Sequence, residues 1–431
     1  MKPEDFYKIF LQFPQICTDS RKVIPGCLYF ALKGEQFDGN SFAADALSKG
    51  CSFAVIDDPG IVDDDRFVLV PDVLKFLQDL ASYHRNNLSI PVIGLTGTNG
   101  KTTTKELIHS VLKQKYPVVA TAGNHNNHIG VPLTLLRVGP ETEIVIVEMG
   151  ANHPGEIDFL CKIARPTLGL ITNIGKAHLE GFGSFNGVVE TKNELYSWIK
   201  NSQGELFVND DDVLLKKLVD DYPCFTYGMN EIADVSGSPV GRDNFLSVCW
   251  RSRGGKINNL IDSHLSGSYN LYNILAAVLA GIHFGLNPEQ IKAGIELYVP
   301  DNMRSQWVRT KNNFLFLDAY NANPSSMALA IEHFASLNLP HSVIILGDMF
   351  ELGIHSEAEH LQIIKQTATL GFEKAIFAGK HFHGLASDLP YLFFESLNIL
   401  QDYLAGNHLK ECNILIKGSR GMQLEKLVAY L

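Results

Sequence analysis

The sequence predicts an α/β protein with three domains, spanning residues 1–88, 89–300 and 301–431. Short apolar runs, often β-branched, alternate with segments whose apolar residues recur at helical spacing, which is typical of parallel sheets covered by helices. A glycine-rich turn joins one such strand to the helix that follows it near residue 97. A chain of 431 residues is long enough for roughly two to four domains.

The first domain is expected to be a small α/β unit. Its predicted strands cover residues 27–32, 53–56 and 68–70, and its predicted helices cover residues 41–49 and 73–84. The segment Thr18-Asp19-Ser20-Arg21 precedes the first strand, and spacing alone favours a polar turn for it. Polar residues 86–89 follow the last helix and predict the boundary with the second domain.

The second domain begins with a strand, a glycine-rich loop and a helix, in the segment VIGLTGTNGKTTTKE. Gly97 and Gly100 allow backbone N–H groups to surround phosphate oxygens, Lys101 reaches the β- and γ-phosphates, and the Thr102 hydroxyl suits Mg²⁺. Leu95 stands where the standard phosphate-loop pattern has glycine, but the Gly-x-x-Gly-Lys-Thr core is intact. The domain is therefore predicted to be a P-loop, mononucleotide-binding parallel sheet.

Further strands of this domain are predicted at residues 116–121, 144–147, 169–173 and 205–209. Glu148 follows the second of these and His178 lies just past the third. A carboxylate at the end of a parallel strand, beside a phosphate loop, is placed to bind Mg²⁺ or to orient water.

The loop after residue 121 is rich in amides and imidazoles, since it contains Asn124, His125, Asn126, Asn127 and His128. The two histidines are possible metal ligands. The simpler interpretation is a polar loop that hydrogen-bonds a ligand.

The rest of this domain offers weaker signals. A helix is expected to open at Thr191, where Lys192 has the pattern of a solvated helix lysine, and residues 224–265 suggest a β-rich extension. A helix is predicted over residues 274–286, preceded by Asn270 and Asn273, which are spaced to share one helical face. Helix capping is the plainer explanation for these two asparagines.

The third domain is predicted to be a Rossmann-like α/β unit with a mostly parallel sheet. Its strands are expected at residues 314–318, 342–346, 374–378 and 413–416. Three of these strands end in distinctive polar tails, which read DAYNANP from Asp318, GDMFELG from Gly347 and KGSR from Lys417.

Composition narrows the functional classes. Lys and Arg number 36 and Asp and Glu 47, so the net charge of −11 disfavours a general nucleic-acid binder. No apolar run is long enough to span a bilayer, and residues 1–10 lack the core of a signal peptide. The seven cysteines form no C-x-x-C pair, which indicates free thiols in a reducing cytoplasm. We expect a cytoplasmic protein, and a monomer.

These segments together resemble the Mur ligase family over nearly the whole chain. TDSRKVIPGCLYFALKGEQFDGNSF is similar to the family's UDP-recognising domain, and GTNGKTTTKE to its phosphate loop. GNHNNHIGVPLTLL, VEMGANHPGEI and NIGKAHLEGFGS are similar to its central blocks. DAYNANPSSM, LGDMFELG and KGSRGM are closest to the branch that adds D-Ala-D-Ala.

The resemblance implies an ATP- and Mg²⁺-dependent ligase that acts on UDP-N-acetylmuramoyl-tripeptide and D-Ala-D-Ala. ATP would phosphorylate the terminal carboxylate of the tripeptide, and the amine of the dipeptide would attack the acyl phosphate. Whether the third residue of the tripeptide is diaminopimelate or lysine stays open.

The resemblance also assigns roles to individual residues. The ATP-binding residues it implies are Gly97, Thr98, Asn99, Gly100, Lys101, Thr102, Thr103, Asn270, Asn273, Arg304 and Asp318. The metal ligands it implies are Thr102, Glu148, His178 and Lys192, the last as a carbamate. Lys101, Glu148, His178 and Lys192 are the catalytic residues it implies. The substrate-binding residues it implies are Ser20, Arg21, Asn124, Asn126 and Asn127 for the UDP-sugar-peptide, and Asn321, Asn323, Lys417 and Arg420 for the dipeptide or acyl phosphate.

The chain departs from the family pattern at Tyr269, Met303 and Leu317, where the family commonly has histidine, glycine and aspartate. Two alternatives compete with the reaction. One is another amide-forming ligase of the superfamily, such as a folylpolyglutamate synthase or the ligase that adds the third residue, against which the YNANP and LGDMFELG blocks argue. The other is a non-catalytic nucleotide-binding regulator, which would not need Glu148, His178 and Lys192.

Overall fold

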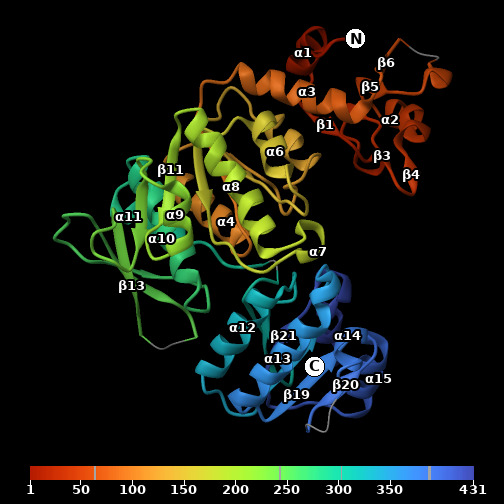
Figure 1. Ribbon diagram of the computed structural model, residues 1–431. Coiled ribbons are helices and arrows are strands. Elements are labelled where there is room, and N and C mark those ends of the chain that lie inside the picture. Colours follow the sequence, from red (N-terminus) through yellow and green to blue (C-terminus); the bar gives the residue numbers. More distant parts are fainter. Residues whose placement is uncertain (63–64, 242–243, 302, 387–389) are drawn as a thin grey trace.

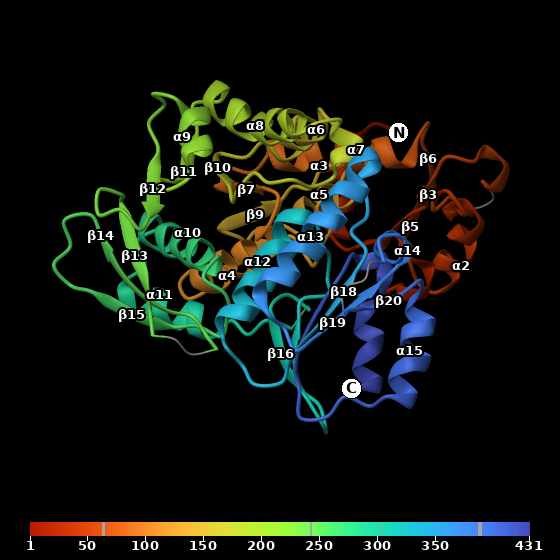
Figure 2. The ribbon, with the colours of Figure 1, turned by 60° about the horizontal axis from the view of Figure 1, so that its bottom comes forward.

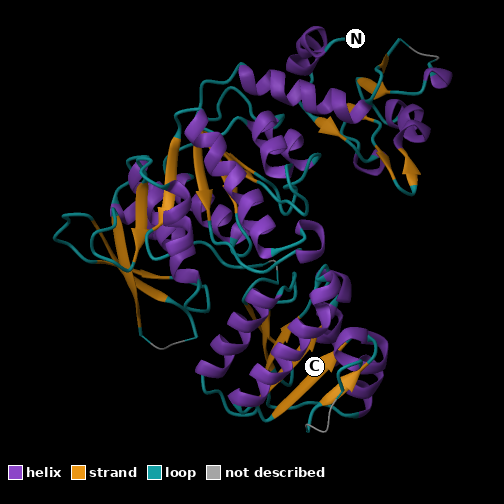
Figure 3. Ribbon diagram, viewed as in Figure 1, coloured by secondary structure: helices purple, strands orange, loops and turns teal. Residues whose placement is uncertain are grey.

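The computed structural model describes residues 1–62, 65–241, 244–301, 303–386 and 390–431. Within these residues the strands form sheets of four, nine and six strands and one two-stranded ribbon (Figures 1 and 3). The three larger sheets occupy successive parts of the chain, residues 16–69, 92–262 and 306–417. The predicted α/β class with mainly parallel sheets is confirmed. The domain boundaries at residues 88/89 and 300/301 stay predictions.

The first sheet is parallel throughout, in the order β1-β2-β5-β6. The elements of this region are α1 (Pro3–Gln12), β1 (Ile16–Cys17), β2 (Leu28–Phe30), the ribbon β3 (Lys33–Gly34) and β4 (Phe37–Asp38), α2 (Ala43–Ser48), β5 (Phe53–Ile56), β6 (Phe67–Leu69) and α3 (Val73–Asn86). The Asp72 side chain accepts a hydrogen bond from Lys75 N and so fixes the start of α3. Phe6 of α1 packs edge-on against Phe76 of α3, with ring centroids 5.4 Å apart.

The central sheet has the order β15-β14-β13-β12-β11-β10-β7-β9-β8. Its strands are β7 (Val92–Thr96), β8 (Val118–Ala120), β9 (Ile144–Glu148), β10 (Leu168–Ile171), β11 (Glu205–Asn209), β12 (Phe225–Gly228), β13 (Val235–Val240), β14 (Ser247–Ser252) and β15 (Asn259–Asp262). Strands β8 to β13 are parallel, and β14 and β15 continue the same sheet as antiparallel strands. The predicted β-rich extension is therefore an extension of the central sheet itself. Strand β7 is buried on both faces, as its run of apolar residues requires.

The helices of the central region cover both faces of this sheet (Figure 2). They are α4 (Lys101–Leu112), α5 (Gly130–Leu135), α6 (Glu156–Ala164), α7 (Leu179–Phe182), α8 (Phe185–Asn201), α9 (Val213–Val219), α10 (Asn270–His283) and α11 (Pro288–Glu296). Two predicted helix starts were wrong. The helix expected to open at Thr191 begins at Phe185, because the Ser184 side chain caps Gly187 N. The helix expected from residue 274 begins at Asn270.

The last sheet has the order β16-β17-β21-β18-β19-β20, and all its pairs are parallel except β16 with β17. Its elements are β16 (Gln306–Arg309), β17 (Phe314–Leu317), α12 (Pro324–Ser336), β18 (Ser342–Gly347), α13 (Ser356–Leu370), β19 (Lys374–Ala378), α14 (Lys380–His383), β20 (Leu392–Phe394), α15 (Leu397–Gly406) and β21 (Asn413–Lys417). The sequence did not reveal β16 and β20, the two edge strands. Each is only half-buried, and so lacks the continuous apolar run that marks the central strands.

The central region lies between the other two (Figure 1). Helix α3 packs against α5 and α6, and α7 meets the short helix η4 (Gly353–His355) of the last region. Among the described residues, no helix combines the length and the apolar character that crossing a bilayer requires.

Candidate active site

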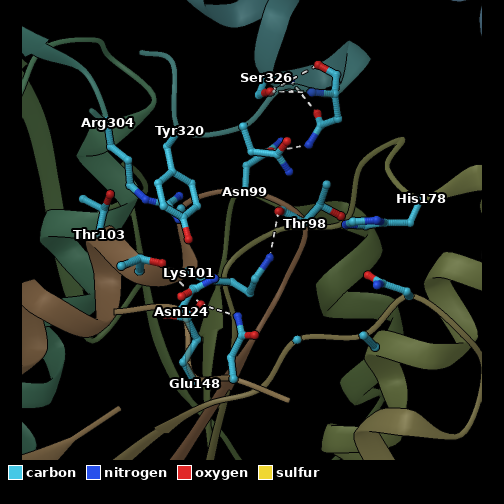
Figure 4. Close-up of a pocket in the computed structure, with 18 of the residues that line it drawn as sticks. Thr98, Asn99, Lys101, Thr103, Asn124, Glu148, His178, Arg304, Tyr320 and Ser326 are labelled. Carbon is cyan, nitrogen blue, oxygen red and sulfur yellow. Dashed lines mark hydrogen bonds between the residues drawn. The ribbon is translucent and has the colours of Figure 1, made fainter. Parts of the chain in front are cut away.

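A cavity of about 520 Å³ lies beside the carboxyl ends of β7 and β9, and both the central and the last region contribute to its lining. Arg304 and Tyr320 reach from the last region toward Lys101, and Glu148 lies beneath (Figure 4). The predicted site residues that line it are Thr98, Asn99, Gly100, Lys101, Thr102, Thr103, Asn124, Asn126, Asn127, Glu148, His178, Asn270, Asn273, Arg304, Asp318, Asn321, Asn323 and Lys417. Thr98 and Lys417, which are 319 positions apart in the chain, therefore meet at one cavity.

The phosphate loop adopts a conformation that its two glycines permit. Gly97 has φ 144° and Gly100 has φ 77°, in the region that side chains disfavour. A Cβ at Gly97 would lie 2.0 Å from Thr172 Oγ1. The loop is tied to the end of β10, because Thr98 N donates to Asn173 O at 2.9 Å and Asn99 N donates to Asn173 Oδ1 at 3.1 Å. Backbone N–H groups at a helix N-terminus make this loop a ready anion site.

Lys101 is the first residue of α4, and its Nζ donates to Gly97 O at 2.7 Å and Thr98 O at 3.0 Å. The pKa of Lys101 is lowered to about 8, mainly by burial and also by the charge of Arg304, while Glu148 opposes the shift. Burial disfavours the charged form of this amine, and a phosphate group bound beside it would stabilise that charged form again.

Glu148, the last residue of β9, has a carboxylate of which only one oxygen is hydrogen-bonded among the described residues. Its Oε1 accepts hydrogen bonds from Asn126 Nδ2 at 2.9 Å and Thr102 Oγ1 at 3.3 Å. Its Oε2 is buried and has no hydrogen-bond partner among the described residues. An unpaired, buried carboxylate oxygen beside a hydroxyl matches the hard oxygen ligands that Mg²⁺ prefers, so these residues fit a divalent cation.

His178 lines the cavity from the turn before α7, with φ 50°. Its Nδ1 lies against Glu351 Oε2 of the last region, and this contact lowers the pKa of Glu351. Within the described part of the chain, no three His, Cys, Asp or Glu side chains are grouped to hold a metal ion by themselves. The metal-site alternative for His125 and His128 therefore finds no third ligand of these types there.

Lys192 is buried in the middle of α8, with a relative exposure of 3%, so the prediction of a solvated lysine was wrong. Its Nζ lies 5.6 Å from the ring centroid of Phe182, and Lys192 is not among the residues that line the cavity. The pKa of Lys192 is lowered to about 7, mainly by burial and also by the charge of Lys101. A substantial fraction of this amine is neutral near pH 7.

Asn270 and Asn273 form a hydrogen-bonded chain that joins α10 to α4. Thr104 Oγ1 donates to Asn273 Oδ1 at 3.0 Å, and Asn273 Nδ2 donates to Asn270 Oδ1 at 2.8 Å. Asn270 Nδ2 then donates to Ser266 O at 2.6 Å. Neither asparagine caps α10, whose N-cap is Tyr269, so the capping explanation was wrong.

The last region brings a cation and an aromatic ring to the cavity together. The Arg304 guanidinium carbon lies 3.8 Å from the centroid of Tyr320, a cation–π distance. Asp318 Oδ1 accepts from Ser305 N at 3.1 Å, and Asp318 Oδ2 pairs with Lys417 Nζ at 2.5 Å. Tyr320 was missed as a site residue, although it stands in the YNANP block directly beyond a strand end.

Asn323 links α12 to the phosphate loop. Its Oδ1 accepts from Ser326 N at 2.8 Å in a capping box, and its Nδ2 donates to Asn99 Oδ1 at 2.9 Å. Asn321 Oδ1 accepts from the backbone N–H of Arg420 at 3.3 Å. The Arg420 side chain points to Glu425, 3.5 Å away, and does not line the cavity.

Four further predicted residues do not line the cavity. Gly97 lies behind the loop it shapes, and Lys192 lies in α8. Ser20 and Arg21 begin a 3-10 helix of the first region, where the Arg21 side chain is 85% exposed and bonded to Asp19. Among the described residues of the first region, none lines this cavity.

The sequence also missed apolar lining residues, among them Phe159 of α6 and Leu329 of α12. They are 41% and 42% exposed. Apolar residues at helical spacing predict core packing, so no pattern in the sequence distinguished these two.

Three family models match consecutive parts of the chain. They are described as "Mur ligase family, catalytic domain" over residues 13–85, "Mur ligase middle domain" over residues 95–281 and "Mur ligase, glutamate ligase domain" over residues 303–420.

Relatives and solved structures agree with these matches. UDP-N-acetylmuramoyl-tripeptide–D-alanyl-D-alanine ligase of Bacillus subtilis (strain 168) is 36% identical, over 96% of this chain and 92% of the relative. The crystal structure of MurF from Acinetobacter baumannii superposes with a TM-score of 0.86 at 29% identity, covering 99% of this chain and 98% of that one. MurF ligase from Thermotoga maritima in complex with ADP has a TM-score of 0.83 at 27% identity, with 97% of both chains covered.

Proposed function

Because the chain belongs to the Mur ligase family, we propose that it is the ATP-dependent, ADP-forming ligase that adds D-Ala-D-Ala to UDP-N-acetylmuramoyl-tripeptide in peptidoglycan precursor synthesis. The observation that carries the proposal is one cavity in which Lys101 of the phosphate loop, the Glu148 carboxylate and Arg304 of the last region converge. Phosphoryl transfer needs a loop that binds the phosphates, a ligand for the cation and a positive charge that stabilises the transition state. The phosphate loop, Glu148 and Arg304 correspond to these three parts.

Each domain has a proposed task. Residues 1–88 recognise the UDP part of the substrate through Ser20 and Arg21, and residues 89–300 bind ATP. Residues 301–431 close on ATP and bind the incoming dipeptide. All seven cysteines are free thiols, which suits a reducing cytoplasm, and we propose that the enzyme works there as a monomer.

The proposed reaction has two steps. An oxygen of the terminal carboxylate attacks the γ-phosphorus of ATP, the bond to the β-phosphate oxygen breaks, and ADP leaves. The amine nitrogen of D-Ala-D-Ala then attacks the acyl carbon, the carbon–oxygen bond breaks, and phosphate leaves while the nitrogen loses a proton. Lys101 and Arg304 neutralise the phosphate charge, because their ammonium and guanidinium groups face the same cavity.

Mg²⁺ is the cofactor that the donor atoms of this site fit. When bound, it would neutralise phosphate oxygens and polarise the phosphorus centre. Thr102 and Glu148 would hold the first ion, and His178 and a carbamate on Lys192 the second. The lowered pKa of Lys192 supports the carbamate, since only a neutral amine adds to CO₂.

The assay that tests this function measures phosphate release from ATP and Mg²⁺, with UDP-N-acetylmuramoyl-tripeptide and D-Ala-D-Ala added singly and together. We expect release only when both are present, together with the pentapeptide product. Offering the diaminopimelate and lysine forms of the tripeptide separately identifies the natural third residue. Release without either substrate, or with glutamate in place of the dipeptide, would refute the assignment.

Two variants test the proposed residues in the same assay. Lys101→Ala and Glu148→Ala should each abolish turnover while the folded structure is kept. Lys113→Ala, at the other end of the same helix α4, is the matched control and should keep normal activity. Near-normal activity in either of the first two variants would remove the role assigned to that residue.

The carbamate has its own test. Incubation with ¹³C-labelled CO₂ should give one protein-bound carbamate resonance that is absent from Lys192→Ala. A spectrum that is identical for both proteins would mean that Lys192 acts as an unmodified amine.

A further inference from the structure

A short stretch of the central region, residues 176–180, forms polar contacts with the last region. His178 Nδ1 lies against Glu351 Oε2, and Glu180 N donates to Glu351 O at 3.2 Å. Lys176 Nζ pairs with Glu359 Oε1 at 2.6 Å, and its backbone N donates to Ser325 Oγ at 3.0 Å. The stretch that carries a proposed metal ligand is thus part of the contact between two domains.

The two residues that face each other here both have unusual backbones. His178 has φ 50° and Glu351 has φ 62°, in the left-handed region that residues other than glycine rarely adopt. Such conformations persist where the surrounding contacts determine them, and they gather at functional sites. The pairing of two left-handed residues across a domain boundary indicates that their orientation is specified from both sides.

A histidine that binds a metal through one ring nitrogen commonly donates the other N–H to a carboxylate, which fixes the tautomer and the ring orientation. Glu351 Oε2 lies against Nδ1 of His178, and this contact leaves the Nε2 atom of the ring available for a metal ion. His178 lines the cavity, and its ring extends from α7 toward Thr98 of the phosphate loop (Figure 4). The arrangement has the form of a carboxylate–histidine pair that faces a metal site.

We propose that Glu351 is a positioning residue for His178, and that it completes the second metal site only while the last region lies against α7. The proposal rests on the metal role of His178 given above, and it adds a residue from the last domain to that site. Metal binding and domain closure are then coupled, because the same carboxylate takes part in both.

The alternative explanation is structural: Glu351 only helps to hold the two domains together. The Lys176–Glu359 pair allows the two explanations to be separated, because it crosses the same boundary without touching His178. A variant that loses this pair removes one interdomain ion pair, as Glu351→Ala does, but leaves the imidazole contact in place.

The experiment measures Mn²⁺ binding by electron paramagnetic resonance, on the whole protein with a non-hydrolysable ATP analogue. Wild type is compared with Glu351→Ala, Glu351→Gln, Glu359→Ala and His178→Ala. We expect Glu351→Ala to weaken the second Mn²⁺ at least 10-fold, in the range reported for partners of metal-binding histidines, and Glu359→Ala to weaken it less than about 3-fold. Glu351→Gln, which keeps an oxygen of similar reach but loses the charge of the ion-pair contact with Nδ1, should lie between wild type and Glu351→Ala.

Each other outcome is decisive. Equal losses in Glu351→Ala and Glu359→Ala would mean that closure alone matters, and no loss in Glu351→Ala would mean that His178 needs no partner; both overturn the inference. If His178→Ala binds Mn²⁺ normally, the proposed metal role of His178 fails first. Melting temperatures identify any variant that does not fold, and Glu351→Gln, which keeps the size of the side chain, then decides in place of Glu351→Ala.

Discussion

The first and the last regions join the central region in different ways. On the first side, polar side chains of α3 are buried and bond to backbone carbonyls: His84 Nε2 lies 3.0 Å from Val138 O, and Gln78 Nε2 donates to His128 O at 3.1 Å. Arg85 donates to Ala164 O at 2.9 Å and to Arg165 O at 3.0 Å. Apolar residues of α3 surround these contacts, in a core that continues through the central region and into the last one.

On the last side, partly exposed side chains pair with each other, and two further contacts involve the buried serines Ser266 and Ser305. Trp307 Nε1 donates to Ser266 Oγ at 2.7 Å, and the Tyr269 hydroxyl lies 2.8 Å from Ser305 Oγ. Lys176, whose side chain is 49% exposed, pairs with Glu359, and Asn323 donates to Asn99 on the phosphate loop. Exposed ion pairs contribute about 0–1 kcal/mol each, because water solvates the separated charges well. Removing the buried guanidinium at the first junction should cost more free energy of unfolding than removing an exposed ion pair, because no water replaces the lost donor at the buried carbonyl.

The difference indicates a fixed junction and a separable one. The first region should move with the central region as one body, while the last region can part from it and return at low cost. This asymmetry suits a ligase, which must admit substrates and then exclude water from an acyl phosphate.

The largest effect is expected from the charge that the separable domain brings to the cavity. Arg304→Ala should lower kcat by about 10³-fold, as the loss of a phosphate-binding arginine does in other phosphoryl-transfer enzymes, and should leave the melting temperature unchanged. Steady-state kinetics with both substrates measures this. Arg309→Ala, five residues further along at the exposed end of β16, is the control and should be silent.

A substitution at the fixed junction should change the free energy of unfolding rather than the rate of turnover. Arg85→Met should lower the free energy of unfolding by roughly 2–4 kcal/mol, since the buried Ala164 O and the partly buried Leu88 O and Arg165 O lose a charged donor. Urea denaturation measures the change. Arg165→Met, which removes only an exposed bond to Asn86, should cost less than about 1 kcal/mol. Equal losses in the two variants would contradict the description of a buried junction.

His333 makes the last side sensitive to pH. Burial lowers the pKa of His333 to about 4, and the ring lies beside Tyr269 of the central region and Phe316. Between pH 6.5 and 4 the unfolded chain binds this proton and the folded chain does not, so stability falls as the pH falls through that window. At pH 5.5 the loss from this residue should be about 1 kcal/mol relative to pH 7.5.

His333→Phe should remove that part of the pH dependence, as measured by urea titrations at pH 5.5 and 7.5. His408→Phe, at an exposed position, should keep it. A slope that is the same in both variants would assign the pH dependence to other groups.

The smallest effect is expected at the separable junction itself. Lys176→Met should change the free energy of unfolding by about 1 kcal/mol, because the Lys176 ammonium is half-exposed while the Glu359 carboxylate is mostly buried. Raising the salt from 0.05 to 0.5 M should also increase the radius of gyration in solution scattering, since salt screens the ion pairs. The same salt step should leave the Arg85→Met difference in unfolding free energy unchanged.

Much of the fold follows from local pattern. The buried runs that became β7, β9, β10 and β11, and the glycines of the phosphate loop, could be recognised because a strand buried on both faces and a left-handed turn each need particular residues in consecutive positions. The edge strands β16 and β20 could not, because half-exposed strands tolerate mixed residues.

Local sequence pattern was enough to predict three α/β units, the phosphate loop with Lys101, and the carboxylate of Glu148 at a strand end. The burial of Lys192, the stacking of Arg304 on Tyr320 and the contact of Glu351 with His178 became visible only in the folded protein. Periodicity reports which face of one element is buried, whereas these contacts join residues that are far apart in the chain and come together only when separate domains pack.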